Sequence, residues 1–191
     1  HLVLLARNQT GYQNLIKLTT RSYLQGFYYK PRIDHESLRE FSEGLIGLSA
    51  CLKGEINERI LSNREAEAEA RAREYADILG SENFFLELQD HGIPEQRAAN
   101  EVLRRMSRKL GLGLVVTNDC HYLHQSDSVA HDVLLCIGTQ RARSDPDRRK
   151  DASEQFYLKS GAELAALFPD DIQALENTVA IAERCNVEIP S

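Results

Sequence analysis

No stretch of this sequence approaches the roughly 20 apolar residues that a helix needs to cross a bilayer. The first residues also lack the basic region and the cleavage site of a secretory signal peptide. Only four cysteines are present, and no two of them form a CxxC pair. We therefore expect free thiols rather than a disulfide framework, and no membrane-spanning segment.

Several catalytic signatures are missing as well. The sequence has no Walker phosphate-binding loop, no GxGxxG dinucleotide motif and no GxSxG nucleophile elbow, so a serine-triad hydrolase has no support. Acidic residues outnumber basic ones, 29 to 23, and the formal net charge is −6. A general basic grip on nucleic acid is therefore not expected, and a phosphate substrate would need metal ions or a confined basic patch.

The remaining composition is that of an ordinary globular protein. With 191 residues, 42% of them hydrophobic and 27% charged, the chain is long enough to form a substantial core. It has no initiator Met and begins in the middle of an apolar pattern, HLVLLA. We expect it to be a piece of a longer protein.

Strand and helix patterns alternate over the first two thirds of the chain. Short apolar runs predict strands at residues 2–5, 45–49, 84–88 and 114–117. Helical periodicity and capping signals predict helices at residues 11–24, 34–41, 64–79 and 94–110. Such alternation indicates an α/β fold with parallel strands, either an open sheet or part of a β/α barrel.

The pattern becomes mostly helical after residue 126. A helix is predicted from about 126 to 137, followed by a charged loop whose basic residues are interrupted by Asp145, Asp147 and Asp151. We expect that loop to be solvated rather than to bind phosphates. Ser160 and Glu163 have capping-box spacing, and a last helix is predicted from 170 to 184.

Polar side chains come directly after two of the predicted strands. Cys51 follows the strand at 45–49, and Asp119 and His121 follow the strand at 114–117. In an extended chain residues i and i+2 point to the same side, so Asp119 and His121 could reach one ion. Carboxylate and imidazole suit Zn²⁺, Mn²⁺ or Fe²⁺, and a nearby thiolate favours zinc.

These residues also have simpler explanations. Asp119 could cap the following helix, His121 could be a hydrogen-bonded loop residue, and Cys51 could be a small buried side chain. His91 follows the third predicted strand and is a weaker ligand candidate. His124 and His131 could complete a local cluster, but a solvated loop and a helix start explain them more simply. His35 is expected on an exposed helix.

Six stretches taken together resemble one family. They are HLVLLARNQTGYQNLIKL, GFYYKPRID, GLIGLSACLKGEI, FFLELQDHG, VVTNDCHYL and ENTVAIAERCN. They are similar to the alpha (catalytic) subunits of bacterial DNA polymerase III, in the polymerase-and-histidinol-phosphatase (PHP) domain and the start of the region after that domain. The resemblance covers essentially the whole chain.

The resemblance implies a fold and a ligand set. The family's PHP domain is a distorted seven-stranded β/α barrel, so residues 1–138 would be the C-terminal part of that barrel. Residues 139–191 would be a linker and a helical segment leading towards the polymerase palm. The metal ligands would be His1, Cys51, Asp119 and His121, the last two acting in catalysis through the bound metal. The family's other ligands, an H-x-H motif among them, would precede His1, and the palm would lie beyond residue 191.

The resemblance also implies a function. The parent protein would carry out template-directed DNA synthesis in the cytoplasm, and its PHP site would be a metal-dependent phosphoesterase similar to a 3′–5′ exonuclease acting on the primer end. Its partners would be DNA and other subunits of the polymerase III holoenzyme. One alternative is a non-catalytic, metal-stabilised scaffold that docks a separate proofreading exonuclease subunit. A weaker alternative is a free-standing PHP phosphatase. The fragment alone is expected to be inactive.

Overall fold

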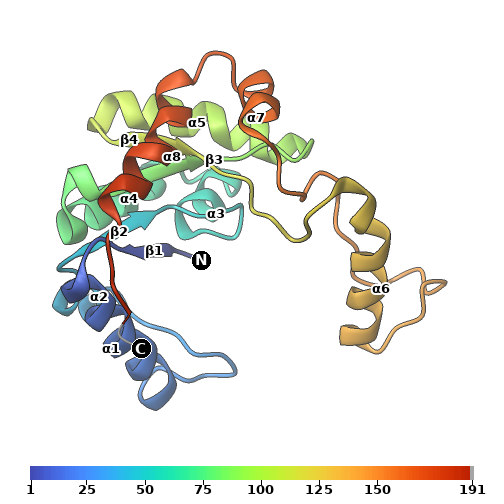
Figure 1. The fold of residues 1–191 in the computed structure, drawn as a ribbon, viewed down its shortest axis with the longest axis horizontal. Coiled ribbons are helices and arrows are strands. Elements are labelled where there is room, and N and C mark those ends of the chain that lie inside the picture. Colours follow the sequence, from blue (N-terminus) through green and yellow to red (C-terminus); the bar gives the residue numbers. More distant parts are fainter. Residues whose placement is uncertain (190–191) are drawn as a thin grey trace.

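The computed structural model describes residues 1–189 and shows a four-stranded sheet with helices on both of its faces (Figure 1). The predicted α/β class is confirmed. The elements in chain order are β1 (Val3–Ala6), α1 (Gln9–Leu24), α2 (His35–Glu40), β2 (Leu45–Leu48), α3 (Glu55–Leu61), α4 (Glu65–Leu79), the 3₁₀ turn η1 (Ser81–Asn83), β3 (Phe84–Leu88), α5 (Pro94–Leu110), β4 (Gly113–Val116), the 3₁₀ turn η2 (Gln125–Asp127), α6 (Ser128–Thr139), α7 (Gly161–Leu167) and α8 (Ile172–Arg184). Over these residues the sheet is open, so a seven-stranded barrel stays a prediction.

Strands β2, β3 and β4 are parallel, as the strand–helix alternation predicts. Gly47 pairs with Phe84, and Leu88 pairs with Val116. Helices α3 and α4 connect β2 to β3, and α5 connects β3 to β4. The carboxyl ends of the three strands therefore lie along one edge of the sheet, where β/α folds usually place functional residues.

Strand β1 is antiparallel to β2, and here the expectation of parallel strands throughout is wrong. The chain leaves β1 through α1 and comes back through α2, so it re-enters the sheet at the end from which it left. Ala6 pairs with Leu45, and the Arg7 nitrogen donates a hydrogen bond to the Gly44 carbonyl at 2.8 Å. The packing of α1 and α2, which returns the chain to the same end of the sheet, accounts for the reversal.

A close contact between two glycines permits this return. A Cβ on Gly11, in the first turn of α1, would lie 2.0 Å from the carbonyl oxygen of Gly44. Gly44 itself has a φ of 74°, a conformation that glycine adopts without strain. The Asn8 side chain caps α1 by accepting a hydrogen bond from the Gly11 nitrogen at 3.0 Å. The backbones of α1 and the β2 entry can thus touch directly.

The alternation of side chains along the strands divides the core into two parts. Phe84, Leu86 and Leu88 of β3 join the larger cluster together with residues of α3, α4 and α5. Phe85 of the same strand points to the opposite face and packs with Ile181 of α8. A strand buried on both faces is typical of parallel sheets covered by helices on each side.

The C-terminal segment packs on this sheet. Helix α8 crosses β4 (Figure 1), where Asn177 Nδ2 donates a hydrogen bond to the Leu114 carbonyl at 2.7 Å. Beyond α8, the Asn186 nitrogen donates to the Arg7 carbonyl at 2.9 Å. The division between residues 1–138 and 139–191 stays a prediction. Part of the second segment nevertheless covers the core of the first.

Helix α6 stands apart from the sheet (Figure 1). The two segments that connect it to the body run side by side: His121 donates its backbone N–H to Phe156 O at 2.8 Å, and Leu158 donates to Leu123 O at 3.3 Å. Among the described residues, none of the helices is long and apolar enough to cross a membrane.

Most helix boundaries agree with the capping signals. Asp34 caps α2, Gly80 follows α4, Pro94 opens α5, and Ser160 forms the expected capping box with Glu163. Helix α3 was not predicted. It has only seven residues, and its N-cap, Gly54, makes no side-chain cap hydrogen bond. Burial of its apolar side chains, rather than a local signal, accounts for it.

Gly11→Ala should lower the free energy of unfolding by about 1–3 kcal/mol, because the new methyl group collides with the Gly44 carbonyl. Gly138→Ala in α6 is the matched control, since a Cβ there has nothing within 4 Å. We expect that control to be neutral or stabilising by up to about 1 kcal/mol. Urea unfolding of both variants measures the difference, and equal effects would contradict the close-contact explanation.

Candidate metal centre

The reversed direction of β1 brings His1 to the carboxyl edge of the sheet. Val3 pairs with Leu48 at the end of β2, so the residues before Val3 lie beside the loop that follows β2. His1 Nδ1 lies 3.4 Å from Cys51 Sγ. Two of the predicted ligands, from distant parts of the sequence, are therefore in contact.

Cys51 is half-buried in a tightly held turn. The preceding residue, Ala50, has a φ of 64°, and Asn57 Nδ2 donates a hydrogen bond to the Cys51 carbonyl at 3.1 Å. Burial raises the pKa of the Cys51 thiol, and the negative charge of Asp119 raises it further. The thiol is thus held in its protonated form, and a bound cation would be needed to favour the thiolate. Asp119 follows β4, so it lies at the same carboxyl edge of the sheet as this turn.

Asp119 and His121 are not aligned in the way that the sequence reasoning assumed. Asp119 has a φ of 46°, so the chain turns there and residues 119–121 are not extended. His121 is exposed, and its Nδ1 lies 2.9 Å from the Asp119 carbonyl oxygen. Its ring meets Phe156 edge-on at 4.8 Å between centroids. The premise of an extended chain is wrong, while the sharing of an ion by these two residues stays a prediction.

The four predicted ligands do not form one closed cage. Within residues 1–189, no group of three or more His, Cys, Asp and Glu side chains is arranged to hold a metal ion. The donor chemistry nevertheless fits zinc, since His1 and Cys51 supply an imidazole and a thiol in contact and Asp119 lies at the same edge of the sheet. The described residues thus offer part of a coordination shell.

Glu87, which the sequence reasoning missed, lies behind this edge and is only 4% exposed. Its Oε2 accepts a hydrogen bond from the Ala50 nitrogen at 2.8 Å. Its Oε1 accepts from the Thr117 hydroxyl and, at 3.1 Å, from Gln89 Nε2. One carboxylate therefore joins the ends of β2 and β4, immediately before the turns that carry Cys51 and Asp119.

The environment of Glu87 perturbs its ionisation. Burial raises the pKa of its carboxyl, and the charge of Asp119 acts in the same direction, while the hydrogen bonds from Thr117, Ala50 and Gln89 act against them. A signal for this residue was present in the sequence. Glu87 is the only charged residue in the apolar strand FFLEL, and a charge in a strand buried on both faces requires hydrogen-bond partners.

His91 is not available as a ligand. It is 1% exposed, and both of its ring nitrogens are engaged. Nε2 donates a hydrogen bond to the Asn118 carbonyl, and Nδ1 accepts one from Gln96 Nε2 at 2.8 Å. Burial lowers the pKa of His91, which keeps the imidazole neutral. Its function in the fold is to hold the backbone immediately before Asp119.

His124 caps a short turn, and His131 of α6 lies beside a carboxylate. His124 forms a capping box with Asp127, whose Oδ2 accepts a hydrogen bond from the His124 nitrogen at 2.8 Å. His131 Nε2 lies 3.1 Å from Asp151 Oδ2. In the charged loop, Arg143 and Arg148 both pair with Asp132 of α6, so these basic side chains already have carboxylate partners.

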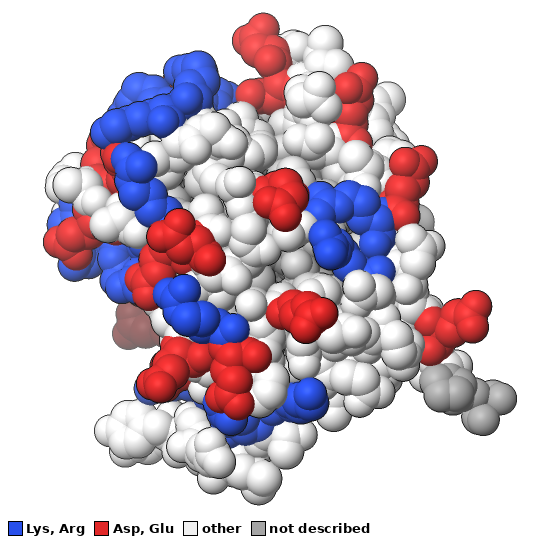
Figure 2. All heavy atoms as spheres, turned by 90° about the vertical axis from the view of Figure 1, so that its left-hand side faces the viewer, with Lys and Arg blue, Asp and Glu red and all other residues white. Residues whose placement is uncertain are grey.

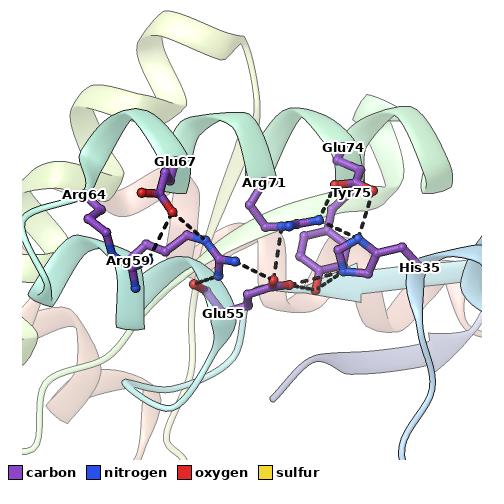
Figure 3. Close-up of polar contacts among 8 residues, drawn as sticks. All are labelled: His35, Glu55, Arg59, Arg64, Glu67, Arg71, Glu74 and Tyr75. Atoms are coloured by element: carbon purple, nitrogen blue, oxygen red, sulfur yellow. Dashed lines mark hydrogen bonds and ion pairs between the residues drawn. The ribbon is translucent and has the colours of Figure 1, made fainter. Parts of the chain in front are cut away.

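His35 is not a simple surface residue, contrary to expectation. It is partly buried in a polar network between α2, α3 and α4 (Figure 3), where its Nε2 lies 3.2 Å from both Glu55 Oε2 and the Tyr75 hydroxyl. Glu55 also pairs with Arg59 at 2.9 Å and with Arg71 at 3.1 Å. The groups satisfy one another, so this cluster joins helices rather than forming a catalytic site.

Charges of both signs are mixed on the neighbouring surface. Figure 2 shows Lys and Arg interspersed with Asp and Glu over the face that includes α4 and α5. Several of them pair between these two helices, for example Lys109 with Glu69 and Arg105 with Glu65. On this face, then, basic side chains of α5 pair with acidic side chains of α4.

Glu55→Gln should lower the free energy of unfolding at pH 7 by about 1–3 kcal/mol, because it removes the charge that two arginines neutralise. Burial alone would raise the pKa of Glu55, but the Tyr75 hydrogen bond and the arginine charges outweigh it and lower the pKa. A lowered folded-state pKa means that the stabilisation is present above the ordinary value of 4.5 and is lost as the pH falls through the folded-state value. The difference between wild type and variant should therefore shrink in acid.

Urea unfolding at pH 7 and at more acidic pH measures this difference. Glu58→Gln is the control, since Glu58 is exposed on the same helix. A difference between wild type and Glu55→Gln that stays constant with pH would contradict the proposed role of the Glu55 charge.

Glu87→Ala should destabilise the protein by about 2–4 kcal/mol, because it leaves buried donors without an acceptor and creates a cavity. Glu87→Gln keeps one carbonyl oxygen and should have a smaller effect. Mass-resolved labelling of Cys51 by a thiol reagent should be faster in the alanine variant, since the turn after β2 loses its anchor. Glu183→Ala on the exposed face of α8 is the control, and equal labelling rates in all variants would contradict the anchoring role.

Comparisons with known proteins agree with the motifs. Residues 1–91 match the PHP domain family. The chain is 50% identical over 190 residues to DNA polymerase III subunit alpha of Treponema pallidum (strain Nichols), a match that covers 100% of this chain and 16% of the relative. It is 48% identical over 193 residues to the subunit alpha of Thermus aquaticus, again covering 100% of the chain and 16% of the relative.

The similarity extends beyond the family match. The match to the PHP domain ends at residue 91, before Asp119 and His121, whereas the similarity to the relatives extends over the whole chain, including the C-terminal helices. The chain spans 16% of the length of these relatives. Residues 1–91 thus match the PHP domain family, and the whole chain is similar to part of the bacterial DNA polymerase III alpha subunits.

Proposed function

We propose that this chain is part of a replicative DNA polymerase subunit, and that the carboxyl edge of its sheet contributes to a divalent-metal phosphoesterase site. The contact between His1 and Cys51 carries the proposal, because it joins an imidazole and a thiol, both common metal ligands, at an edge that also carries Asp119. The similarity to DNA polymerase III alpha subunits supports the replicative context.

Four residues would hold the ions: His1, Cys51, Asp119 and His121. Their imidazole, thiolate and carboxylate groups favour zinc, with manganese or iron as alternatives. The remaining ligands would lie in parts of the parent protein that precede His1, in a completed seven-stranded barrel. In this proposal residues 139–191 lead from the barrel towards the polymerase palm.

The bound ions would lower the pKa of a coordinated water and neutralise the phosphodiester oxygens. The residues of this chain have distinct tasks in that reaction. Glu87 and His91 hold the backbones from which Cys51 and Asp119 project. Because the chain is acidic overall, a polyanionic substrate would depend on the positive charge of the ions at the site.

The substrate would be the 3′ end of a DNA primer, and removal of a mismatched nucleotide would be 3′–5′ exonuclease proofreading. The parent protein would act with other subunits of the polymerase III holoenzyme in the cytoplasm. A free-standing PHP phosphatase is disfavoured, since the similarity to the polymerase subunits continues through the C-terminal helices.

A second candidate function is equally compatible with a partial ligand set. No group of three or more metal-binding side chains is assembled within residues 1–189. In this alternative the domain is a scaffold that ions only stabilise, and its surface docks a separate proofreading exonuclease subunit. Such a protein would retain metal without hydrolysing DNA.

The test uses the full-length parent protein with zinc or manganese and a primer that ends in a mismatch. In the double variant Asp119→Ala/His121→Ala, the rate of primer shortening should fall by about 100-fold or more, while the protein retains its fold. The control pair His124→Ala/Asp127→Ala, from the same segment, should retain activity because its side chains form a helix cap.

Unchanged primer shortening in the first double variant would refute the catalytic role of the pair. Bound metal measured by elemental analysis, together with a chelator-lowered melting temperature and no hydrolysis, would favour the scaffold.

A further inference from the structure

The loop between α1 and α2 presents a group of aromatic side chains to solvent. We call residues 23–33, which are the last two residues of α1 and the loop after them, the aromatic loop. Their exposed fractions are high: Tyr23 60%, Phe27 58%, Tyr28 64% and Tyr29 83%. Aromatic rings usually bury most of their surface, and large exposed apolar groups are a mark of binding sites.

The rings are arranged in pairs rather than collapsed on the core. Tyr23 and Phe27 stack with centroids 6.4 Å apart and ring planes at 27°. Tyr28 and Tyr29 meet edge to face, with centroids 4.7 Å apart and ring planes at 78°. Most of the surface of each ring is left free for a ligand.

The backbone of the aromatic loop holds this arrangement. The Tyr28 nitrogen donates a hydrogen bond to the Lys30 carbonyl at 3.1 Å, closing a tight turn with Tyr29 at its tip. Tyr29 has a φ of 58°, which is unfavourable for a bulky residue. At the base of the loop, a Cβ on Gly26 would lie 1.9 Å from the Arg32 carbonyl oxygen, so the two arms of the loop touch.

Positive charge accompanies the rings. Lys30 and Arg32 lie within the loop, and residues 26–33 contain no Asp or Glu. The Arg32 guanidinium lies 5.4 Å from the centre of the Tyr28 ring. The first acidic residue after the loop, Asp34, is occupied in capping α2 through the Ser37 nitrogen at 2.8 Å. The loop is therefore a local cationic and aromatic surface on an acidic protein.

We propose that the aromatic loop binds single-stranded DNA, with bases stacked on Tyr28 and Tyr29 and phosphates near Lys30 and Arg32. Exposed aromatic rings beside cationic side chains are the combination that proteins use for single strands, since every base has a face that stacks. Duplex DNA would not suit the rings, because its bases are already stacked on one another. The proposal concerns a surface other than the metal centre and does not depend on hydrolysis there.

The experiment uses the full-length parent protein and a thymidine oligonucleotide that carries one photoreactive 5-iododeoxyuridine. Irradiation followed by peptide mapping should give adducts on residues 26–32, and the same sequence in a duplex should give few. Mapping distinguishes this surface from other DNA-binding parts of the protein. Lys30→Gln/Arg32→Gln should reduce the adduct yield about tenfold at moderate salt and weaken its dependence on salt.

Two further variants separate stacking from other contacts. Tyr28→Phe/Tyr29→Phe should retain the adducts, because phenylalanine also stacks, whereas Tyr28→Ala/Tyr29→Ala should lower the yield at Phe27 about tenfold. Leu134→Ala/Ile137→Ala, exposed apolar residues on α6, is the control and should leave the yield unchanged.

The absence of adducts on residues 23–33, with adducts elsewhere in the protein, would overturn the proposal. So would equal yields with single-stranded and duplex DNA, or an adduct yield at Phe27 that the tyrosine-to-alanine change does not alter. The first of these results would leave a protein partner as the occupant of the loop.

Discussion

The buried carboxylate of Glu87 holds together the edge of the sheet on which the candidate site depends. It accepts a hydrogen bond from the Ala50 backbone on one side and from the Thr117 hydroxyl on the other. These two positions precede the turns that carry Cys51 and Asp119. Burying a carboxylate without such hydrogen-bond donors would cost much free energy. The positions of the donors and of the carboxylate therefore depend on one another. Small movements of either turn would break these hydrogen bonds, and the turns are therefore held in a defined relation before any ligand arrives.

The direction of β1 has an equally direct consequence. Because α1 and α2 return the chain to the end of the sheet that it left, β1 runs against β2 and its first residues lie beside the carboxyl end of that strand. A parallel β1 would place His1 at the opposite edge, far from Cys51. The contact between two glycines at residues 11 and 44 is a local requirement of this return. The position of His1 beside Cys51 thus depends on a backbone contact at the other end of β1 and β2.

Much of the fold could be predicted from local patterns, and the failures have physical causes. Strand β3 and helix α5 follow from an apolar run and a regular periodicity with Pro94 at the helix start. Strand direction could not be predicted, since it depends on how α1 and α2 pack and not on the residues of β1. The location of Cys51 and Asp119 at the carboxyl edge could be predicted from their positions after strands, but the turn at Asp119, with its φ of 46°, could not. The role of Glu87 in joining β2 and β4 could not be predicted, because a strand pattern does not show which polar groups surround a buried charge.

The central claim is that Cys51 and the residues around it bind one group of divalent ions. X-ray absorption spectroscopy at the zinc edge of the full-length, zinc-loaded parent protein tests it most directly. The account predicts a mixed shell of nitrogen and oxygen with one sulfur at about 2.3 Å, and the loss of that sulfur in Cys51→Ser. A spectrum without sulfur, or a sulfur contribution that survives the substitution, would contradict it.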